Sequence, residues 1–374
     1  MILFVQKPTE KAENRAAMTP AAAKKLIGLG ISIEMPAGTG DKSSYPDQQY
    51  IDEGVTISQS PDESLAKADI VYGLELPKAA TFKKMKEGAV YLGRVEPFGN
   101  AKLISAAAKA KVRLVSMEMI PRTTLAQKMD ILSSQANLAG YQAVITGASR
   151  LDKILPMMMT PAGTISPSKV FIIGVGVAGL QAIATAKRLG ARVQAFDTRP
   201  VVEEQVKSLG AKFVKIDLGE TGQTEQGYAK ELTEEQLEMQ RQGMAKVCAD
   251  SDIVITTAKL FGRKAPIIVT ADMVAAMAPG SVIIDLAAET GGNVEGTKVD
   301  KEVVTENGVK IIGIGKLENE LPTHASQMYA ANLANFTEHF WDSEKGELVL
   351  DPEDEIIQGS LLTDNGEIIH PTFK

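Results

Sequence analysis

Short apolar runs alternate with amphipathic segments along most of the chain. Before residue 118 the apolar runs predict strands at Ile2–Val5, Ile31–Met35, Val55–Ile57, Asp69–Tyr72, Ala89–Leu92 and Val112–Met117. The intervening segments predict helices that include Pro20–Leu29, Asp62–Lys67 and Asn100–Ala110. Thr19 and Pro20 supply a cap residue followed by a proline at the first helical position. This alternation predicts a parallel sheet covered by helices.

The same rhythm returns after a different middle segment. Residues 118–168 begin as a loop, predict a long helix that reaches about Leu151, and end in a loop with three consecutive methionines. Further strands are predicted at Lys169–Ile173, Arg192–Phe196, Lys212–Ile216, Asp252–Thr256, Ser281–Leu286 and Lys310–Ile314. The polar, glycine-bearing insertion 218–230 is typical of a lid, with a plain surface excursion as the alternative, and leads to a charged helix from Thr233 to Cys248.

The last part of the chain loses this pattern. An amphipathic helix over His324–Phe336 is expected to return to the first domain, and Asn365-Gly366 predicts a hairpin between strands Ile356–Leu362 and Glu367–His370. The resulting prediction is an α/β chain with two Rossmann-like, doubly wound parallel-sheet domains. Residues 1–133 and 320–374 form a discontinuous domain without a nucleotide loop, and residues 134–319 form the nucleotide-binding domain.

Composition narrows the class of protein. The chain has 374 residues, which favours two domains, and a net charge of −7, which argues against a nucleic-acid partner. Cys248 is the only cysteine and the three histidines are scattered, so no metal site is predicted. The uncharged run Val170–Ala186 contains glycines where a strand, turn and helix need them, so we do not interpret it as a membrane span.

One strand–helix junction carries the most specific chemical signal. An apolar strand leads into Gly174-x-Gly176-x-x-Gly179, a small-residue helix follows, and the next strand ends in Asp197. This order is the dinucleotide-binding fingerprint: the glycines permit a tight turn, backbone approach to a pyrophosphate and close helix packing. Asp197 is expected to accept hydrogen bonds from the adenosine ribose, favouring NAD(H), although Arg199 is of a type that accepts a 2′-phosphate.

Several further segments resemble one known family. They are Arg15-Ala-Ala-Met-Thr-Pro20, residues 121–135 from Pro121-Arg122 to Ser133-Ser134-Gln135, Met157–Gly163, Gly174–Gly179, Ala195–Pro200, Gly227–Lys230, Ile255–Ala258 and Ser281–Ala287. Over nearly its whole length the chain resembles the NAD(H)-binding component, domain I, of proton-translocating nicotinamide nucleotide transhydrogenase. Alanine dehydrogenase and saccharopine-type dehydrogenases are relatives of that family.

The resemblance implies direct hydride transfer from NADH to NADP⁺ bound on a partner domain, a step that needs no general acid or base. It implies that Arg122 contacts the nicotinamide side, that Gln127 faces the partner's nucleotide, and that Asp130 and Ser133 orient the carboxamide. Tyr228 corresponds to the tip of a mobile loop that closes on NADH. The nucleotide contacts expected from the fingerprint and the resemblance are Gly174, Val175, Gly176, Val177, Ala178, Gly179, Asp197, Thr198, Arg199, Gly227, Gln240, Thr257, Ala258 and Lys259.

Simpler structural roles remain open for these side chains. Asp130 and Ser133 are also suited to cap a helix, Arg122 to form a structural ion pair, and Tyr228 to pack as an ordinary aromatic. Leu125, Lys128 and Lys259 depart from the family pattern, which bears on affinity and on partner docking.

Two other functions compete with this one. An amino-acid dehydrogenase of the alanine dehydrogenase type uses a lysine after one strand and a histidine near the next. Here the corresponding stretches, Asp69–Glu75 and Tyr91–Glu96, contain neither residue type. Arg15 alone is a carboxylate anchor without an acid–base partner. The second rival is a regulatory NAD(H)-binding module, against which the Arg122, Gln127, Asp130 and Ser133 set argues.

The expected assembly follows from the same resemblance. The NADP(H)-binding domain and the membrane-spanning proton-channel domain are expected on separate chains. A homodimer is expected, cytoplasmic and attached peripherally to the inner (plasma) membrane without inserting into it.

Overall fold

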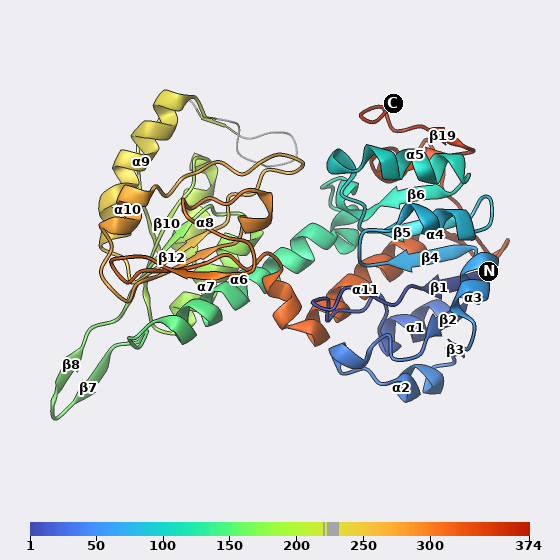
Figure 1. The fold of residues 1–374 in the computed structure, drawn as a ribbon, viewed down its shortest axis with the longest axis horizontal. Coiled ribbons are helices and arrows are strands. Elements are labelled where there is room, and N and C mark those ends of the chain that lie inside the picture. Colours follow the sequence, from blue (N-terminus) through green and yellow to red (C-terminus); the bar gives the residue numbers. More distant parts are fainter. Residues whose placement is uncertain (220, 223–231) are drawn as a thin grey trace. The chain divides into compact units, whose positions relative to one another are not determined.

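The computed structural model describes residues 1–219, 221–222 and 232–374, which form two compact units (Figure 1). Unit 1 comprises Met1–Gln135 and Asn319–Lys374, and unit 2 comprises Ala136–Glu318. The chain passes from the first unit to the second along one helix, α6 (Ile131–Arg150).

Unit 1 contains an eight-stranded sheet in the order β19-β18-β6-β5-β4-β1-β2-β3. Its strands are parallel from β6 to β3, whereas β18 and β19 run antiparallel at one edge. The bounds are β1 (Ile2–Val5), β2 (Ser32–Pro36), β3 (Thr56–Ser58), β4 (Ile70–Gly73), β5 (Val90–Gly93), β6 (Arg113–Ser116), β18 (Leu361–Asp364) and β19 (Glu367–Ile368). A smaller two-stranded sheet pairs β16 (Trp341–Asp342) with β17 (Glu347–Leu348).

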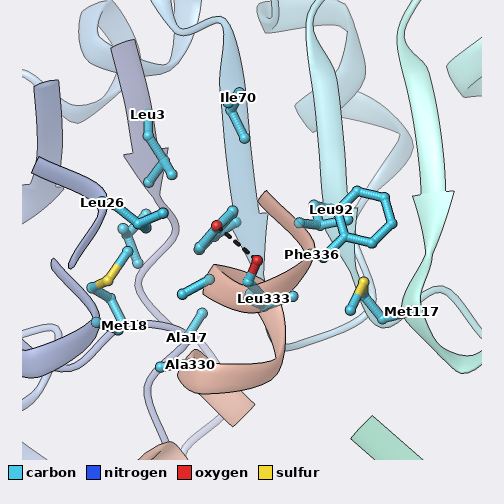
Figure 2. Packing of buried hydrophobic residues seen from close by; sticks show 14 of the residues in the cluster. Leu3, Ala17, Met18, Leu26, Ile70, Leu92, Met117, Ala330, Leu333 and Phe336 are labelled. Carbon is cyan, nitrogen blue, oxygen red and sulfur yellow. Dashed lines mark hydrogen bonds between the residues drawn. The ribbon is translucent and has the colours of Figure 1, made fainter. Parts of the chain in front are cut away.

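Alternating side chains of the strands fill two cores in unit 1, one on each face of the sheet. Leu3, Ile70 and Leu92 face α1 and α11, and Figure 2 shows them opposite Leu333 and Phe336 of α11. The other face packs against α3, α4 and α5. The helices of the unit are α1 (Pro20–Ile27), α2 (Asp47–Asp52), α3 (Pro61–Lys67), α4 (Ala79–Lys84), α5 (Ala101–Lys109), α11 (Pro322–His339), α12 (Glu355–Ser360), and the short 3-10 turns η1 (Asp41–Ser43), η2 (Pro97–Gly99), η3 (Met117–Met119) and η4 (Ala126–Met129).

Unit 2 contains a seven-stranded sheet in the order β11-β10-β9-β12-β13-β15-β14, parallel except at β14. From the central strand β9 the chain builds outward first through β10 and β11, and then on the other side through β12, β13 and β15. The carboxyl ends of β9 and β12 therefore form the topological switch point, where such sheets bind ligands. The strands are β9 (Lys169–Ile173), β10 (Arg192–Phe196), β11 (Lys212–Phe213), β12 (Ile253–Thr256), β13 (Val282–Asp285), β14 (Glu302–Val304) and β15 (Lys310–Ile312).

Helices cover both faces of this sheet. One core joins the strands to α6, α7 (Val177–Arg188) and α8 (Glu203–Ser208), and the other joins them to α9 (Glu234–Ala249) and α10 (Ala271–Ala275). The start of α9 is set by a capping box, in which Thr233 and Gln236 each bond the other's backbone N–H. Short 3-10 turns lie at η5 (Pro200–Val202), η6 (Ala288–Thr290) and η7 (Leu317–Glu320), the last at the point where the chain leaves unit 2 for unit 1.

A hairpin of β7 (Met158–Thr160) and β8 (Gly163–Ile165) extends away from the rest of unit 2 (Figure 1). The sequence predicts this segment only as a loop, because it offers three apolar residues and no alternating pattern. Its side chains are exposed, including Met159 at 74%.

One predicted element is wrong at the C-terminal end. Residues 356–360, predicted as the start of a strand, belong to helix α12, and β18 begins only at Leu361. The helix forms because the Asp354 side chain accepts hydrogen bonds from the N–H groups of Ile356 and Ile357. The predicted Asn365-Gly366 turn is confirmed, with φ of 49° and 86° at the two residues.

Candidate functional site

The glycines after β9 form a tight turn that leads directly into α7. Gly174 has φ of 94°, and a Cβ there would lie 2.5 Å from the Thr257 Oγ1. A Cβ at Gly179 would overlap the Gly174 carbonyl oxygen. Both positions therefore require glycine, one for backbone conformation and both for close approach. The first and third glycines of the motif serve the turn and the packing of helix on strand.

The second glycine leaves the start of α7 accessible. No atom lies within 4 Å of a Cβ built at Gly176, and no side chain caps the helix. The N–H groups at the helix start, around Val177 and Ala178, therefore remain available to a ligand, and the helix dipole favours an anion there. These residues fit the pyrophosphate of a dinucleotide.

Asp197 lies at the end of β10, beside the turn, and both of its carboxylate oxygens are bonded. The Val175 N–H donates to Oδ2 at 2.7 Å, and the Arg199 N–H donates to Oδ1 at 2.8 Å. The Arg199 guanidinium forms a fork with the same carboxylate, from Nε at 2.9 Å and from Nη2 at 2.8 Å. This pairing raises the pKa of Arg199. A ribose hydroxyl that reaches Asp197 must share or displace these donors.

The segment after β12 lines the other side of the switch point. The Thr257 hydroxyl donates to the Gly174 carbonyl at 3.0 Å, which ties this segment to the glycine turn. Ala258 is half-buried and Lys259 is exposed. Thr198 is half-buried, and its carbonyl accepts a 2.6 Å bond from the Thr221 hydroxyl.

Gln240 of α9 is 4% exposed. Its amide makes no hydrogen bond to another residue in the part of the chain that the structure describes. A buried amide that lacks a partner among these residues is suited to bond a ligand. Tyr228 and Gly227, the remaining predicted residues of unit 2, lie outside the described residues.

In unit 1, Arg122 and Gln127 lie on an exposed loop that continues through η4 into α6. Asp130 caps α6, accepting from the Ser133 N–H at 2.9 Å and from the Ser133 hydroxyl at 2.6 Å. The capping role considered for this pair is therefore present. It also aligns the Asp130 carboxylate rigidly at the end of the loop.

Helix α11 supports this loop. Asn332, which is 6% exposed, donates to the Lys128 carbonyl at 2.9 Å and accepts from the Ser134 hydroxyl at 2.7 Å. Asn335 donates to the same carbonyl at 2.9 Å. The Asn332 amide thus joins the loop to the first turn of α6. The sequence analysis missed this role, because asparagine in an amphipathic helix carries no signal of its distant partner.

The corresponding dehydrogenase positions in unit 1 are occupied by the protein's own contacts. Arg15 is 4% exposed, and its guanidinium bonds both oxygens of Glu13, at 2.8 and 2.9 Å. The Tyr91 hydroxyl fills the space in which a side chain at Gly73 would stand. Glu75, after β4, accepts from the N–H groups of Thr9 and Glu10. A buried Arg15 already paired with a carboxylate is poorly placed to anchor the carboxylate of an amino acid.

Unit 2 contains a buried acid that the sequence analysis did not single out. Asp285 is fully buried at the end of β13, and its carboxylate accepts hydrogen bonds from the side chains of Thr256 and Thr297 and from three backbone N–H groups. An acid that ends an apolar strand run was the available signal. Its neighbour Asn293 is also fully buried.

Other candidate chemistries find little support. Among the described residues no group of His, Cys, Asp or Glu could hold a metal ion. Cys248 is buried, which raises the pKa of its thiol to about 12 and makes it unreactive at neutral pH. Among the described helices, none combines the length and the hydrophobicity that crossing a membrane requires.

Comparisons with known proteins agree with the fold and the glycine turn. Residues 4–139 match the family Alanine dehydrogenase/PNT, N-terminal domain, and residues 143–371 match its C-terminal domain. The chain is 43% identical to an NAD(P) transhydrogenase subunit alpha of Rhodospirillum rubrum, over 100% of this chain and 99% of the relative.

Solved structures give the same result. The crystal structure of transhydrogenase from Sinorhizobium meliloti is 40% identical, covers 100% of both chains and has a TM-score of 0.86. An L-alanine dehydrogenase has a TM-score of 0.82 at 21% identity, covering 100% of this chain and 98% of the other, which shows the shared fold alone. The comparisons favour the transhydrogenase interpretation over the alanine dehydrogenase alternative. The chain belongs to the alanine dehydrogenase/PNT family and, within it, to the NAD(P) transhydrogenase alpha subunits.

Proposed function

We propose that this protein is the NAD(H)-binding catalytic component of a proton-translocating, Re/Si-specific transhydrogenase. The observation that carries the proposal is the glycine turn before α7, open at Gly176 and backed by Asp197, in a chain 43% identical to a transhydrogenase alpha subunit. Bound NADH supplies the hydride, which passes directly to NADP⁺ held by a partner domain. A separate membrane subunit couples this exchange to proton translocation.

The residues of unit 2 bind and select the nucleotide. The N–H groups at the start of α7 bind the pyrophosphate, and the buried Gln240 amide and the segment Thr257–Lys259 provide further contacts. Asp197 accepts the ribose hydroxyls and its negative charge disfavours a 2′-phosphate, which makes NADH rather than NADPH the ligand of this unit. Arg199 remains next to that carboxylate and weakens the repulsion.

The loop of unit 1 orients the reacting ring. Arg122 contacts the nicotinamide side, Gln127 faces the partner's nucleotide, and Asp130 with Ser133 orients the carboxamide. Because no proton moves in a hydride transfer, these residues serve to align the donor and to exclude water. Tyr228 closes over the nucleotide in the same scheme.

The protein is proposed to act as a homodimer, peripheral to the cytoplasmic face of the membrane. The exposed apolar hairpin β7–β8 supports the dimer, because Met157, Met158, Met159 and Ile165 are 45–74% exposed and a second copy would cover them. Sedimentation should give a dimer, and Met159→Glu should shift it toward monomer. A monomeric wild-type protein would contradict the homodimer proposal.

A reconstituted exchange assay tests the activity. The protein is mixed with a recombinant NADP(H)-binding transhydrogenase domain, NADH and an oxidised NAD analogue, and reduction of the analogue is followed. Turnover should require the partner domain and fall strongly in Gln127→Asn and Asp130→Asn. Gln49→Asn, at an exposed position of unit 1, is the matched control and should retain wild-type turnover.

Two outcomes would contradict the proposal. Turnover with pyruvate and ammonia in the absence of the partner domain would identify an amino-acid dehydrogenase. Tight NADH binding without turnover in any mixture would identify a regulatory module.

A further inference from the structure

The buried amide of Asn293 holds one wall of the nucleotide crevice in place. The segment that follows β12, residues 257–266, contains Ala258 and Lys259 and has little regular secondary structure of its own. It lies at the switch point beside the glycine turn, to which Thr257 is bonded. A binding wall made of loop must be kept in position by contacts from elsewhere in the fold.

Asn293 provides those contacts through its side chain. The amide oxygen accepts from the Ala258 N–H at 3.0 Å, and the amide nitrogen donates to the Ala258 carbonyl at 3.0 Å and to the Pro266 carbonyl at 2.9 Å. One amide therefore bonds both backbone groups of Ala258 and the far end of the same loop. Asparagine suits this position because it combines an acceptor with two donors on a short side chain.

Asn293 is itself anchored on both backbone groups. Its N–H donates to the Asp285 Oδ2 at 2.8 Å, and its carbonyl accepts from the N–H groups of Ile268 and Val269 at 2.8 and 3.0 Å. Asp285 is at the end of β13, so the anchor is part of the central sheet. Gly292 has φ of 81°, and a Cβ there would lie 2.9 Å from the Asp285 Oδ2. Close approach of this backbone to the carboxylate therefore requires glycine.

We infer that Asn293, anchored by Asp285, is a positioning residue for nucleotide binding. It acts through the backbone of Ala258 and sets the distance between the segment after β12 and the glycine turn. This inference rests on the proposed binding of NADH in unit 2. It extends that proposal to residues with no expected contact to the nucleotide.

The test compares two asparagines of the same unit. Asn293→Ala removes the loop contacts, whereas Asn307→Ala removes three similar bonds, from Nδ2 to the carbonyls of Val274, Ala275 and Met277. Both changes should lower the melting temperature, because each frees backbone carbonyls. Only Asn293→Ala should weaken NADH binding, measured by fluorescence titration of the whole protein, by about tenfold or more.

Asn293→Asp sharpens the comparison, because it retains the acceptor for the Ala258 N–H and loses both donors. It should also weaken NADH binding. Wild-type affinity in both Asn293 variants, or equal losses in Asn293→Ala and Asn307→Ala, would overturn the inference while leaving NADH binding intact. Failure of the wild-type protein to bind NADH would instead refute the proposed function.

A measurement on the wild-type protein covers the case in which the Asn293 variants do not fold. Hydrogen–deuterium exchange of residues 257–266 should slow when NADH is added, because the ligand packs against a wall already held by Asn293. Exchange in this segment that is unaffected by saturating NADH would contradict the inference.

Discussion

Gly140, on the long helix α6, lies outside the glycine motif and yet should control it. A Cβ at this position would overlap the carbonyl oxygen of Ala178, and would lie 2.9 Å from both the carbonyl carbon and the Cα of that residue. Ala178 is the second residue of α7, whose first turn is proposed to bind the pyrophosphate. The Gly140→Ala change therefore pushes on the backbone of the phosphate site.

The size of the effect follows from the distances. Ordinary contacts between carbon atoms are about 3.5–4.0 Å, so the two helices must separate by several tenths of an ångström or more. Overpacking of this kind costs about 1–3 kcal/mol, and the better helix propensity of alanine offsets about 0.5–1 kcal/mol. We expect a net loss of about 1–2 kcal/mol in the free energy of unfolding. In a unit of this size each kcal/mol corresponds to about 2–4 °C in melting temperature.

The displacement should also reach the ligand. Moving the first turn of α7 misaligns its N–H groups, so we expect NADH affinity to fall by about tenfold. Thermal unfolding and fluorescence titration measure the two effects separately on the same sample.

Gly147, on the same helix, is the matched control. A Cβ there would lie 3.2 Å from the Cγ2 of Ile253 and 3.6 Å from the Cγ1 of Ile284, and such side-chain atoms can shift. Gly147→Ala should therefore leave stability within about 1 kcal/mol of wild type and NADH affinity unchanged. The reasoning is refuted if Gly140→Ala retains wild-type stability and affinity, or if both variants lose affinity equally.

Three further predictions concern other parts of the chain. Arg199→Ala exposes the charge of the paired carboxylate, so the ratio of the NADPH to the NADH dissociation constant should rise about tenfold in fluorescence titrations; an unchanged ratio would exclude this pair from selectivity. Asn332→Ala frees the Lys128 carbonyl and the loop that carries it, and should slow hydride exchange in the reconstituted assay more than Asn335→Ala does, with NADH affinity unchanged; equal effects would contradict a role for the buried amide. Burial lowers the pKa of His370 below its usual value, so the folded state favours the neutral ring and stability should fall as pH drops through about 6.5. The fall in melting temperature between about pH 7.5 and about pH 5.5 should be smaller in His370→Gln, and an identical fall would remove His370 as its source.

Much of the fold was readable from the sequence because its signals are local. The strands Ile2–Val5, Lys169–Ile173 and Arg192–Phe196 have the predicted bounds, since each is an apolar run limited by turn residues. The glycine turn and the Asn365-Gly366 hairpin depend on backbone conformations that few residues adopt, so their residues identify them. The two-sheet α/β class follows from the repeated alternation of such elements.

The tertiary structure decided what depends on distant partners. Residues 356–360 have a short apolar pattern that suits a strand or a helix, and the Asp354 cap settled it as a helix. The Arg199 fork on Asp197 and the Asn332 bonds to Lys128 join groups whose identity alone does not name their partners. The same holds for the Asn293 clamp on Ala258, 35 residues away in the chain. Sequence patterns report the periodicity and the conformational limits of neighbouring residues, whereas a hydrogen bond across the fold exists only once packing has brought its donor and acceptor together.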